Sequence, residues 1–295
     1  VGRQRRNVDE AISPIFHRPV MGRKGIGKLS LFSIANSISI FSTKDNEKNA
    51  LCISTADLRK CIEKNEIYYP EELPVSGIEF SFNGTKIVLT ELKKKRTAAL
   101  STFLKRRIAR RFSVIGEQYH FSVKVNGSEV TISDRNYLPK AQLLWIYPSE
   151  EDPLFSAECL LKQCAPSLKE SYIRTSSFEL EGKTVQIYGW IATASEPGKL
   201  QDEEETINRI SIMVRGKMAK EDILPSIHST AIYTKYIFGE IHADFLDSDD
   251  MEDITTSSRQ DFFVDDDRYL ALLNFITEEL SYIRTTWEDM RSSAG

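Results

Sequence analysis

The sequence contains no apolar run long enough to cross a membrane. Its longest apolar stretches, such as residues 29–41, are interrupted by serine and asparagine. They fall short of the roughly 20 residues that a spanning helix needs. The first residues carry arginines, but no apolar core of a signal peptide follows them. We therefore expect a cytoplasmic protein that makes no contact with a membrane.

Cysteine and histidine are also scarce. The 4 cysteines form no Cys-x-x-Cys pair and have no histidine at metal-binding spacing, which argues against structural zinc and against a disulfide framework. The 4 histidines are scattered, and no Ser-His-Asp or paired-carboxylate pattern is visible. The sequence therefore predicts neither a metal site nor an independent catalytic centre.

The length and composition indicate two packed domains. A chain of 295 residues exceeds the size at which a single core usually stops growing. Apolar residues make up 41% and charged residues 28%, a balance typical of globular proteins. Pro148 and three acidic residues lie within positions 147–152, directly before Pro153, and indicate a linker. We expect one domain over residues 1–148 and a second over residues 153–295.

Hydrophobic periodicity predicts an α+β order without regular βαβ alternation. Strands are expected over residues 37–42, 51–55, 85–89, 184–193, 209–214 and 236–243. The Asn126-Gly127 pair predicts a hairpin turn between residues 120–125 and 129–132. Helices are expected over residues 27–35, 98–112 and 269–290, and the last has an apolar face of Leu270, Leu273, Ile276, Leu280 and Ile283.

The net charge of −4 conceals an uneven distribution. Nine cations lie within residues 93–111, whereas acidic residues gather at 202–205, 247–253 and 265–267. Such a basic run can neutralise several phosphates of DNA or RNA. Its candidate nucleic-acid contacts are Lys105, Arg106, Arg107, Arg110 and Arg111. The alternative is an amphipathic helix whose basic face is only solvated.

A glycine-rich segment, Gly22-Arg23-Lys24-Gly25-Ile26-Gly27-Lys28, leads into a predicted helix. Glycines permit close backbone approach, and free N–H groups at a helix start favour a phosphate. The spacing excludes a P-loop, because Leu29 stands where a hydroxyl residue is required. A dinucleotide fingerprint lacks its preceding strand. The segment therefore indicates either a phosphate cradle or a simple helix cap.

Residues 21–42 resemble the segment of GHKL ATPases in which the ATP lid ends in Gly-x-x-Gly-x-Gly. This family includes gyrase, the ninety-kilodalton heat-shock chaperone, histidine kinases and MutL. Gly84-Thr85 resembles its last nucleotide motif, and residues 252–261 are similar to the catalytic loop of the heat-shock chaperone and of MORC proteins. The resemblance implies a two-layer α/β sandwich, a partial Bergerat ATP-binding fold, followed by an α+β transducer domain.

The resemblance also implies a set of site residues and cofactors. ATP and Mg²⁺ are the cofactors expected of the intact protein, and Arg259 is the expected γ-phosphate sensor. The implied nucleotide contacts are Gly22, Gly25, Ile26, Gly27, Lys28, Thr85, Lys217 and Lys220. For the two later lysines, the alternative is an exposed position in a polar loop.

The sequence departs from the family before residue 22. It has no Glu-x-x-x-Asn and no Asp-x-Gly-x-Gly there, so we expect that it begins inside the nucleotide fold. Without the general base and the metal-binding amide, this chain alone is expected to bind ATP weakly and to hydrolyse almost none.

The predicted function is therefore part of an ATP-dependent conformational clamp. In the intact protein the clamp would hydrolyse ATP, dimerise through the absent N-terminal segment and act on DNA or on a protein client. The alternatives are a GHKL-like scaffold without catalysis and a nucleic-acid-binding module that uses residues 93–111.

Overall fold

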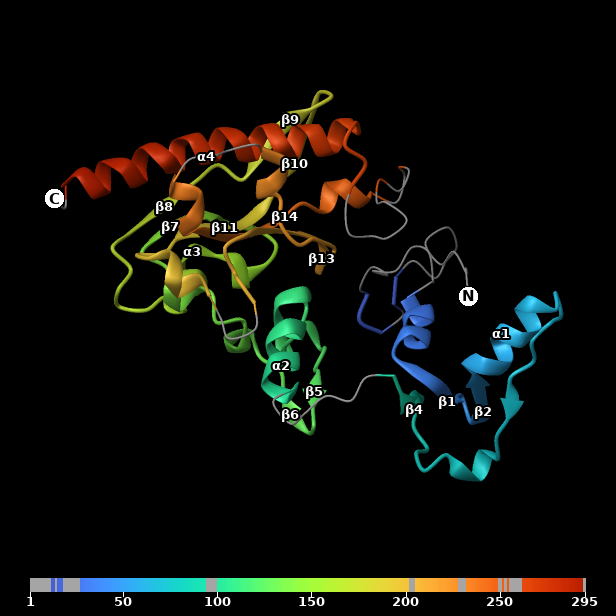
Figure 1. Ribbon diagram of the computed structural model, residues 1–295. Helices are drawn as coiled ribbons and strands as arrows, with labels where there is room; N and C mark the ends of the chain where they lie inside the picture. Colours follow the sequence, from blue (N-terminus) through green and yellow to red (C-terminus); the bar gives the residue numbers. More distant parts are fainter. Residues whose placement is uncertain are drawn as a thin grey trace. The chain divides into compact units, whose positions relative to one another are not determined.

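The computed structural model describes residues 12–13, 15–17, 27–93, 100–201, 205–227, 232–248, 251, 254 and 262–293 (Figure 1). The chain divides into two compact units. Residues 27–93 belong to unit 1, and the other described residues belong to unit 2. The boundary expected between residues 148 and 153 lies inside unit 2. No helix in the described ranges has both the length and the apolar character to cross a bilayer.

Unit 1 is an antiparallel sheet with one helix beside it. The strands lie in the order β3-β2-β1-β4. Ser54 accepts a hydrogen bond from the Asp57 backbone N–H and caps helix α1. The elements are η2 (Gly27–Ser33, a 3₁₀ helix), β1 (Ala35–Lys44), β2 (Glu47–Ser54), α1 (Thr55–Glu63), β3 (Glu71–Glu72) and β4 (Gly84–Leu92).

Unit 2 is built on a six-stranded sheet in the order β13-β12-β14-β11-β7-β8. The β12–β14 and β7–β8 pairs are parallel, and the other pairs are antiparallel. The strands of this sheet are β7 (Leu143–Tyr147), β8 (Glu170–Ile173), β11 (Tyr188–Thr193), β12 (Ile210–Val214), β13 (Lys217–Lys220) and β14 (Ile237–His242). The remaining elements are α2 (Leu100–Arg111), β5 (Lys124–Val125), β6 (Ser128–Glu129), α3 (Ala157–Lys162), β9 (Ser177–Leu180), β10 (Lys183–Gln186) and α4 (Asp267–Ser293).

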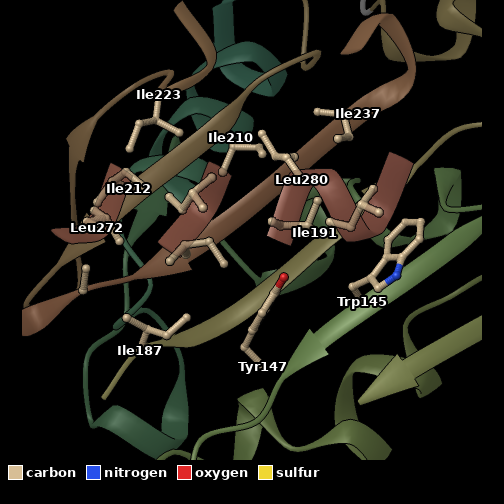
Figure 2. Close-up of a cluster of buried hydrophobic side chains, with 14 of the residues drawn as sticks. Trp145, Tyr147, Ile187, Ile191, Ile210, Ile212, Ile223, Ile237, Leu272 and Leu280 are labelled. Carbon is tan, nitrogen blue, oxygen red and sulfur yellow. The ribbon is translucent and has the colours of Figure 1, made fainter. Parts of the chain in front are cut away.

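The sheet of unit 2 is buried on both faces, because successive side chains of a strand point to opposite sides. In β7, Trp145 and Tyr147 pack in the same cluster as helix α4, and Figure 2 shows them with Leu272 and Leu280 of that helix. Ile146 packs instead with Phe155 in a second cluster on the other face. Each sheet face therefore has its own apolar core.

Helix α4 confirms the predicted final helix, but its buried face is rotated from the prediction. Leu270 is exposed, whereas Tyr269, Leu272 and Trp287 are buried with the other apolar residues of the helix. The buried positions follow intervals of three and four residues, as a helical stripe requires. Leu270 and Leu272 are two positions apart and so lie on opposite sides of the helix, and only Leu272 faces the core.

The predicted strand over residues 184–193 is wrong as a single strand. Gln186 pairs with Ser177 in the small β9–β10 sheet, whereas Tyr188 pairs with His242 in the large sheet. Alternation of side chains is the same in both sheets, so it cannot show where the chain passes from one to the other. The other five predicted strands and both later helices are confirmed, with shifted ends. The first predicted helix is the short 3₁₀ helix η2.

The predicted hairpin at Asn126-Gly127 is confirmed. Asn126 and Gly127 both have positive φ, 51° and 78°, as the two-residue turn of a tight hairpin requires. The paired strands β5 and β6 are only two residues long. The mixed α+β class is therefore confirmed, whereas the expected GHKL-type sandwich is not.

Candidate nucleic-acid interface

Helix α2 carries the basic residues that were predicted as nucleic-acid contacts. Their side chains differ in how deeply they are buried. Arg110 is only 1% exposed, and its Nε donates to the Arg135 carbonyl at 3.0 Å. Arg107 and Arg111, one turn apart, have side chains 35% and 44% exposed. Arg110 is therefore a structural residue, whereas Arg107 and Arg111 reach the surface.

Two carboxylates, Glu205 and Glu221, lie among four guanidinium groups at this helix. Glu221 is 2.8 Å from Arg209, 3.2 Å from Arg111 and 3.9 Å from Arg107. The second carboxylate, Glu205, pairs with the buried Arg110 and lies 3.5 Å from Arg209. We call these six residues the arginine cluster.

Among the described residues, four guanidinium groups of the arginine cluster share two carboxylates. A local excess of cations draws an anion toward the surface. Glu221 is itself 47% exposed. Water therefore screens the outer ion pairs, and each contributes little to stability. A phosphate oxygen can join this arrangement without displacing a strong pair.

The remaining basic residues of α2 are partly buried. Lys105 Nζ is 3.5 Å from an Asp134 carboxylate oxygen, and its side chain is 20% exposed. Arg106 is half-buried. The guanidinium of Arg107 also lies 5.3 Å from the centre of the Phe103 ring, a cation–π contact that holds its orientation.

A buried ion pair fixes the end of helix α2. Arg135 donates from Nε to the Ala109 carbonyl at 3.0 Å and from Nη2 to the Phe112 carbonyl at 3.2 Å. The Ala109 carbonyl belongs to the last turn of the helix and Phe112 follows directly after it, where backbone acceptors lack helical partners. The third side-chain nitrogen of Arg135, Nη1, donates to Glu240 at 3.2 Å. Arg135 thus connects the helix end to strand β14.

Glu240 lies at the centre of this connection and is 1% exposed. His242 shares its sheet face, and the His242 ring nitrogen Nε2 is 2.8 Å from a Glu240 oxygen. Burial by itself raises the pKa of Glu240, but the Arg135 guanidinium and the hydrogen bond from His242 outweigh it, so the pKa is lowered. Glu240 is therefore the anion that holds Arg135 in place.

The other sequence-predicted site residues are dispersed. Lys217 is exposed, and its backbone bridges to Phe112 just beyond α2. Lys220 is buried, with its ammonium 5.7 Å from the centre of the Tyr269 ring. Gly22, Gly25, Ile26 and Arg259 lie outside the described residues.

Three further predicted residues belong to unit 1. Lys28 is exposed, and Thr85 Oγ1 lies 3.3 Å from the Ser42 hydroxyl. A Cβ at Gly27 would meet no atom within 4 Å. The described structure therefore gives no reason for glycine at position 27.

No group of three or more His, Cys, Asp or Glu side chains could hold a metal ion in the part of the chain that the structure describes. The carboxylates nearest the candidate interface, Glu205 and Glu221, are engaged by arginines. We therefore derive no metal-dependent step from these residues.

The chain is similar to a bacterial protein of greater length. It is 36% identical over 293 residues to a protein of Herpetosiphon aurantiacus described as "Putative type II restriction enzyme HgiDII". The match covers 99% of this chain and 46% of the relative, so the chain spans about half the length of that protein. No protein-family model matches the chain.

This similarity overturns the resemblance to GHKL ATPases. The relative that matches nearly the whole chain is described as a restriction enzyme. The assignment to the GHKL family is therefore wrong, and so is the predicted ATP-dependent clamp with its ATPase activity. The resemblance rested on short glycine and threonine motifs, which recur in many folds as turns and caps. A match over 293 residues outweighs them.

Sequence reasoning missed Glu205, Glu221, Arg135 and Glu240. Only Glu240 carried a usable signal, since it stands in a strand whose neighbours Phe238 and Ile241 are apolar. A charged residue at such a buried position requires a partner. The sequence does not show which cation supplies it.

Proposed function

We propose that this chain contributes a DNA-binding surface, centred on helix α2, to a restriction-enzyme-like protein. The arginine cluster, in which four guanidinium groups share two carboxylates, carries the proposal. Similarity to a described restriction enzyme supports DNA as the ligand. Phosphate contacts position a protein on DNA without reading its sequence. We assign no cleavage step to the described residues.

The surface combines two kinds of cation with separate tasks. Arg110 and Arg135 are buried and hold α2 against the sheet of unit 2. Arg107 and Arg111 lie on the outer side and would contact backbone phosphates. Guanidinium groups suit this role because their planar donors pair with two phosphate oxygens at once.

Replacing Arg106, Arg107 and Arg111 with alanine in the full-length protein is expected to weaken DNA binding by about ten- to a hundredfold. Fewer counterions are released on binding, so the slope of log K against log salt should flatten by about 2 to 3. Fluorescence anisotropy with a short duplex, repeated over a range of salt, measures both quantities.

A matched control removes three exposed cations elsewhere in unit 2: Lys162, Arg284 and Arg291. It changes the net charge equally but should leave the salt slope near that of the wild type. Equal loss in the two triple variants would show a general charge effect and refute the proposed surface. Thermal melting of both variants verifies that they are folded.

A further inference from the structure

The carboxylate of Glu221 contacts three guanidinium groups of the arginine cluster through its two oxygens. Its Oε1 atom accepts a hydrogen bond from Arg209 Nη1 at 2.8 Å and lies 3.9 Å from Arg107 Nη2. Its Oε2 atom accepts a hydrogen bond from Arg111 Nη2 at 3.2 Å. Guanidinium groups bind the oxygens of a carboxylate and of a phosphate in the same way. Glu221 therefore lies where these arginines would bind an oxyanion of the DNA backbone.

The two carboxylates of the cluster differ in how deeply they are buried. The Glu205 side chain is 11% exposed and pairs with the buried Arg110. The Glu221 side chain is 47% exposed, and its partners Arg107 and Arg111 also reach the surface. Water screens ion pairs between such exposed side chains, so each is weak. An incoming phosphate can therefore replace Glu221 at these two arginines, whereas Glu205 stays in place.

The backbone at Glu221 is fixed, so only its side chain has to move. Glu221 directly follows strand β13, and the hydroxyl of Ser211, which is 3% exposed, donates to its carbonyl at 2.8 Å. The carboxylate of the next residue, Asp222, accepts from the Ile210 and Leu224 backbone N–H groups at 3.2 and 3.0 Å. Rotation about the side-chain bonds of Glu221 therefore moves the carboxylate without disturbing the sheet.

Arg209 keeps other partners when Glu221 turns away. Its side chain is 10% exposed, and its Nη2 atom lies 3.5 Å from a Glu205 oxygen. Its Nη1 atom also donates to the Thr206 carbonyl at 3.2 Å. A charge at such a depth is costly unless an opposite charge or a hydrogen bond compensates it. Displacement of Glu221 thus leaves Arg209 with a carboxylate and a carbonyl as partners.

We propose that Glu221 occupies, in the DNA-free protein, the place that a backbone phosphate takes at Arg107 and Arg111 in the DNA complex. The proposal rests on the proposed function, because these two arginines must first be phosphate contacts. Glu221 then competes with DNA for both guanidinium groups. Phosphate contacts carry no sequence information, so the competition lowers the affinity for every duplex alike.

Glu221→Gln in the full-length protein tests the competition, because the amide keeps the shape of the side chain and loses its charge. The variant should bind a short duplex about three- to tenfold more tightly than the wild type, since phosphates no longer displace a carboxylate. Fluorescence anisotropy at about 50 mM salt measures both affinities. The control is Glu288→Gln, which removes a similarly exposed carboxylate paired with Arg284 on α4 and should change the affinity by less than about twofold.

A second background separates competition from a general effect of charge. In a variant with Arg107→Ala and Arg111→Ala, the further change Glu221→Gln should increase the affinity by less than about twofold. The two guanidinium groups for which carboxylate and phosphate compete are then absent. A general effect of charge would bring the same gain in both backgrounds.

The outcomes separate this inference from the proposed function. Unchanged or weaker DNA binding by Glu221→Gln, an equal gain in Glu288→Gln, or an equal gain in the background without Arg107 and Arg111 would overturn the competition and leave DNA binding at α2 in place. Failure of the wild type to bind any duplex would overturn both. Equal affinity of the wild type and of the variant without the two arginines would also overturn both.

Discussion

Glu240→Ala is expected to lower the free energy of unfolding by about 3–5 kcal/mol, the usual effect of removing one partner of a buried ion pair. Glu240 is 1% exposed and is the carboxylate partner of Arg135. Without it, the Arg135 guanidinium stays buried with an uncompensated charge. Denaturant unfolding of the variant and the wild type measures the difference.

Loss of the Glu240–Arg135 ion pair should also destabilise the end of helix α2. Arg135 holds the carbonyls of Ala109 and Phe112, so its displacement should accelerate amide exchange in the last turn of the helix. Glu158→Ala is the matched control, since it removes only an exposed pair with Lys162 and should cost at most about 0.5 kcal/mol. A loss below about 1 kcal/mol in Glu240→Ala would show that the ion pair does not hold the helix.

The dependence of stability on acid pH tests whether the negative charge of Glu240 stabilises the fold. The pKa of Glu240 is lowered from its ordinary value of 4.5 in the folded protein. Its contribution is therefore fully present above pH 4.5 and is lost as the pH falls through the folded pKa. The stability difference between wild type and Glu240→Gln should be constant near neutral pH and should shrink in acid.

Gly189→Ala is expected to destabilise unit 2 by more than about 3 kcal/mol, because two separate penalties combine. Gly189 lies in β11 with a φ of 133°, and a Cβ there would be 2.1 Å from the Glu240 carbonyl oxygen. The adjacent strand would have to move away from its hydrogen-bonded partner. Thermal and denaturant unfolding check the loss.

Gly198→Ala serves as the control for this substitution. A Cβ at position 198 meets no atom within 4 Å, so the change should stay within about 0.5 kcal/mol. If Gly189→Ala unfolds at the same denaturant concentration as Gly198→Ala, the close strand approach described at Gly189 does not exist.

Local patterns in the sequence predicted the elements but not their partners. The turn at Asn126-Gly127 and helix α2 depend on neighbouring residues, so both were predictable. The pairs Arg110–Glu205 and Arg135–Glu240 join residues 95 and 105 positions apart. Patterns of neighbouring residues cannot predict ion pairs over such sequence separations. In the sequence, the arginines of the cluster on α2 therefore appeared only as part of a basic run without known partners.

The erroneous family assignment has a related physical cause. Glycine-rich turns before helices and threonines at strand starts are common solutions to local backbone geometry. At Gly27 a Cβ would meet no atom of the described structure within 4 Å. The basic helix was the more informative feature, because in the described part of the chain four guanidinium groups at this helix share two carboxylates.

Photo-crosslinking from helix α2 shows whether this helix lies against bound DNA. Thr102 is exposed and lies one turn before Arg106 on the same helix face, whereas Ser281 is exposed on α4. A photoreactive phenylalanine analogue is placed at either position of the full-length protein, and a labelled duplex is added before irradiation. We predict that DNA is crosslinked at position 102 and not at 281. Strong crosslinking at 281 with none at 102, while DNA binding is intact, would show that DNA lies on α4 and not on α2.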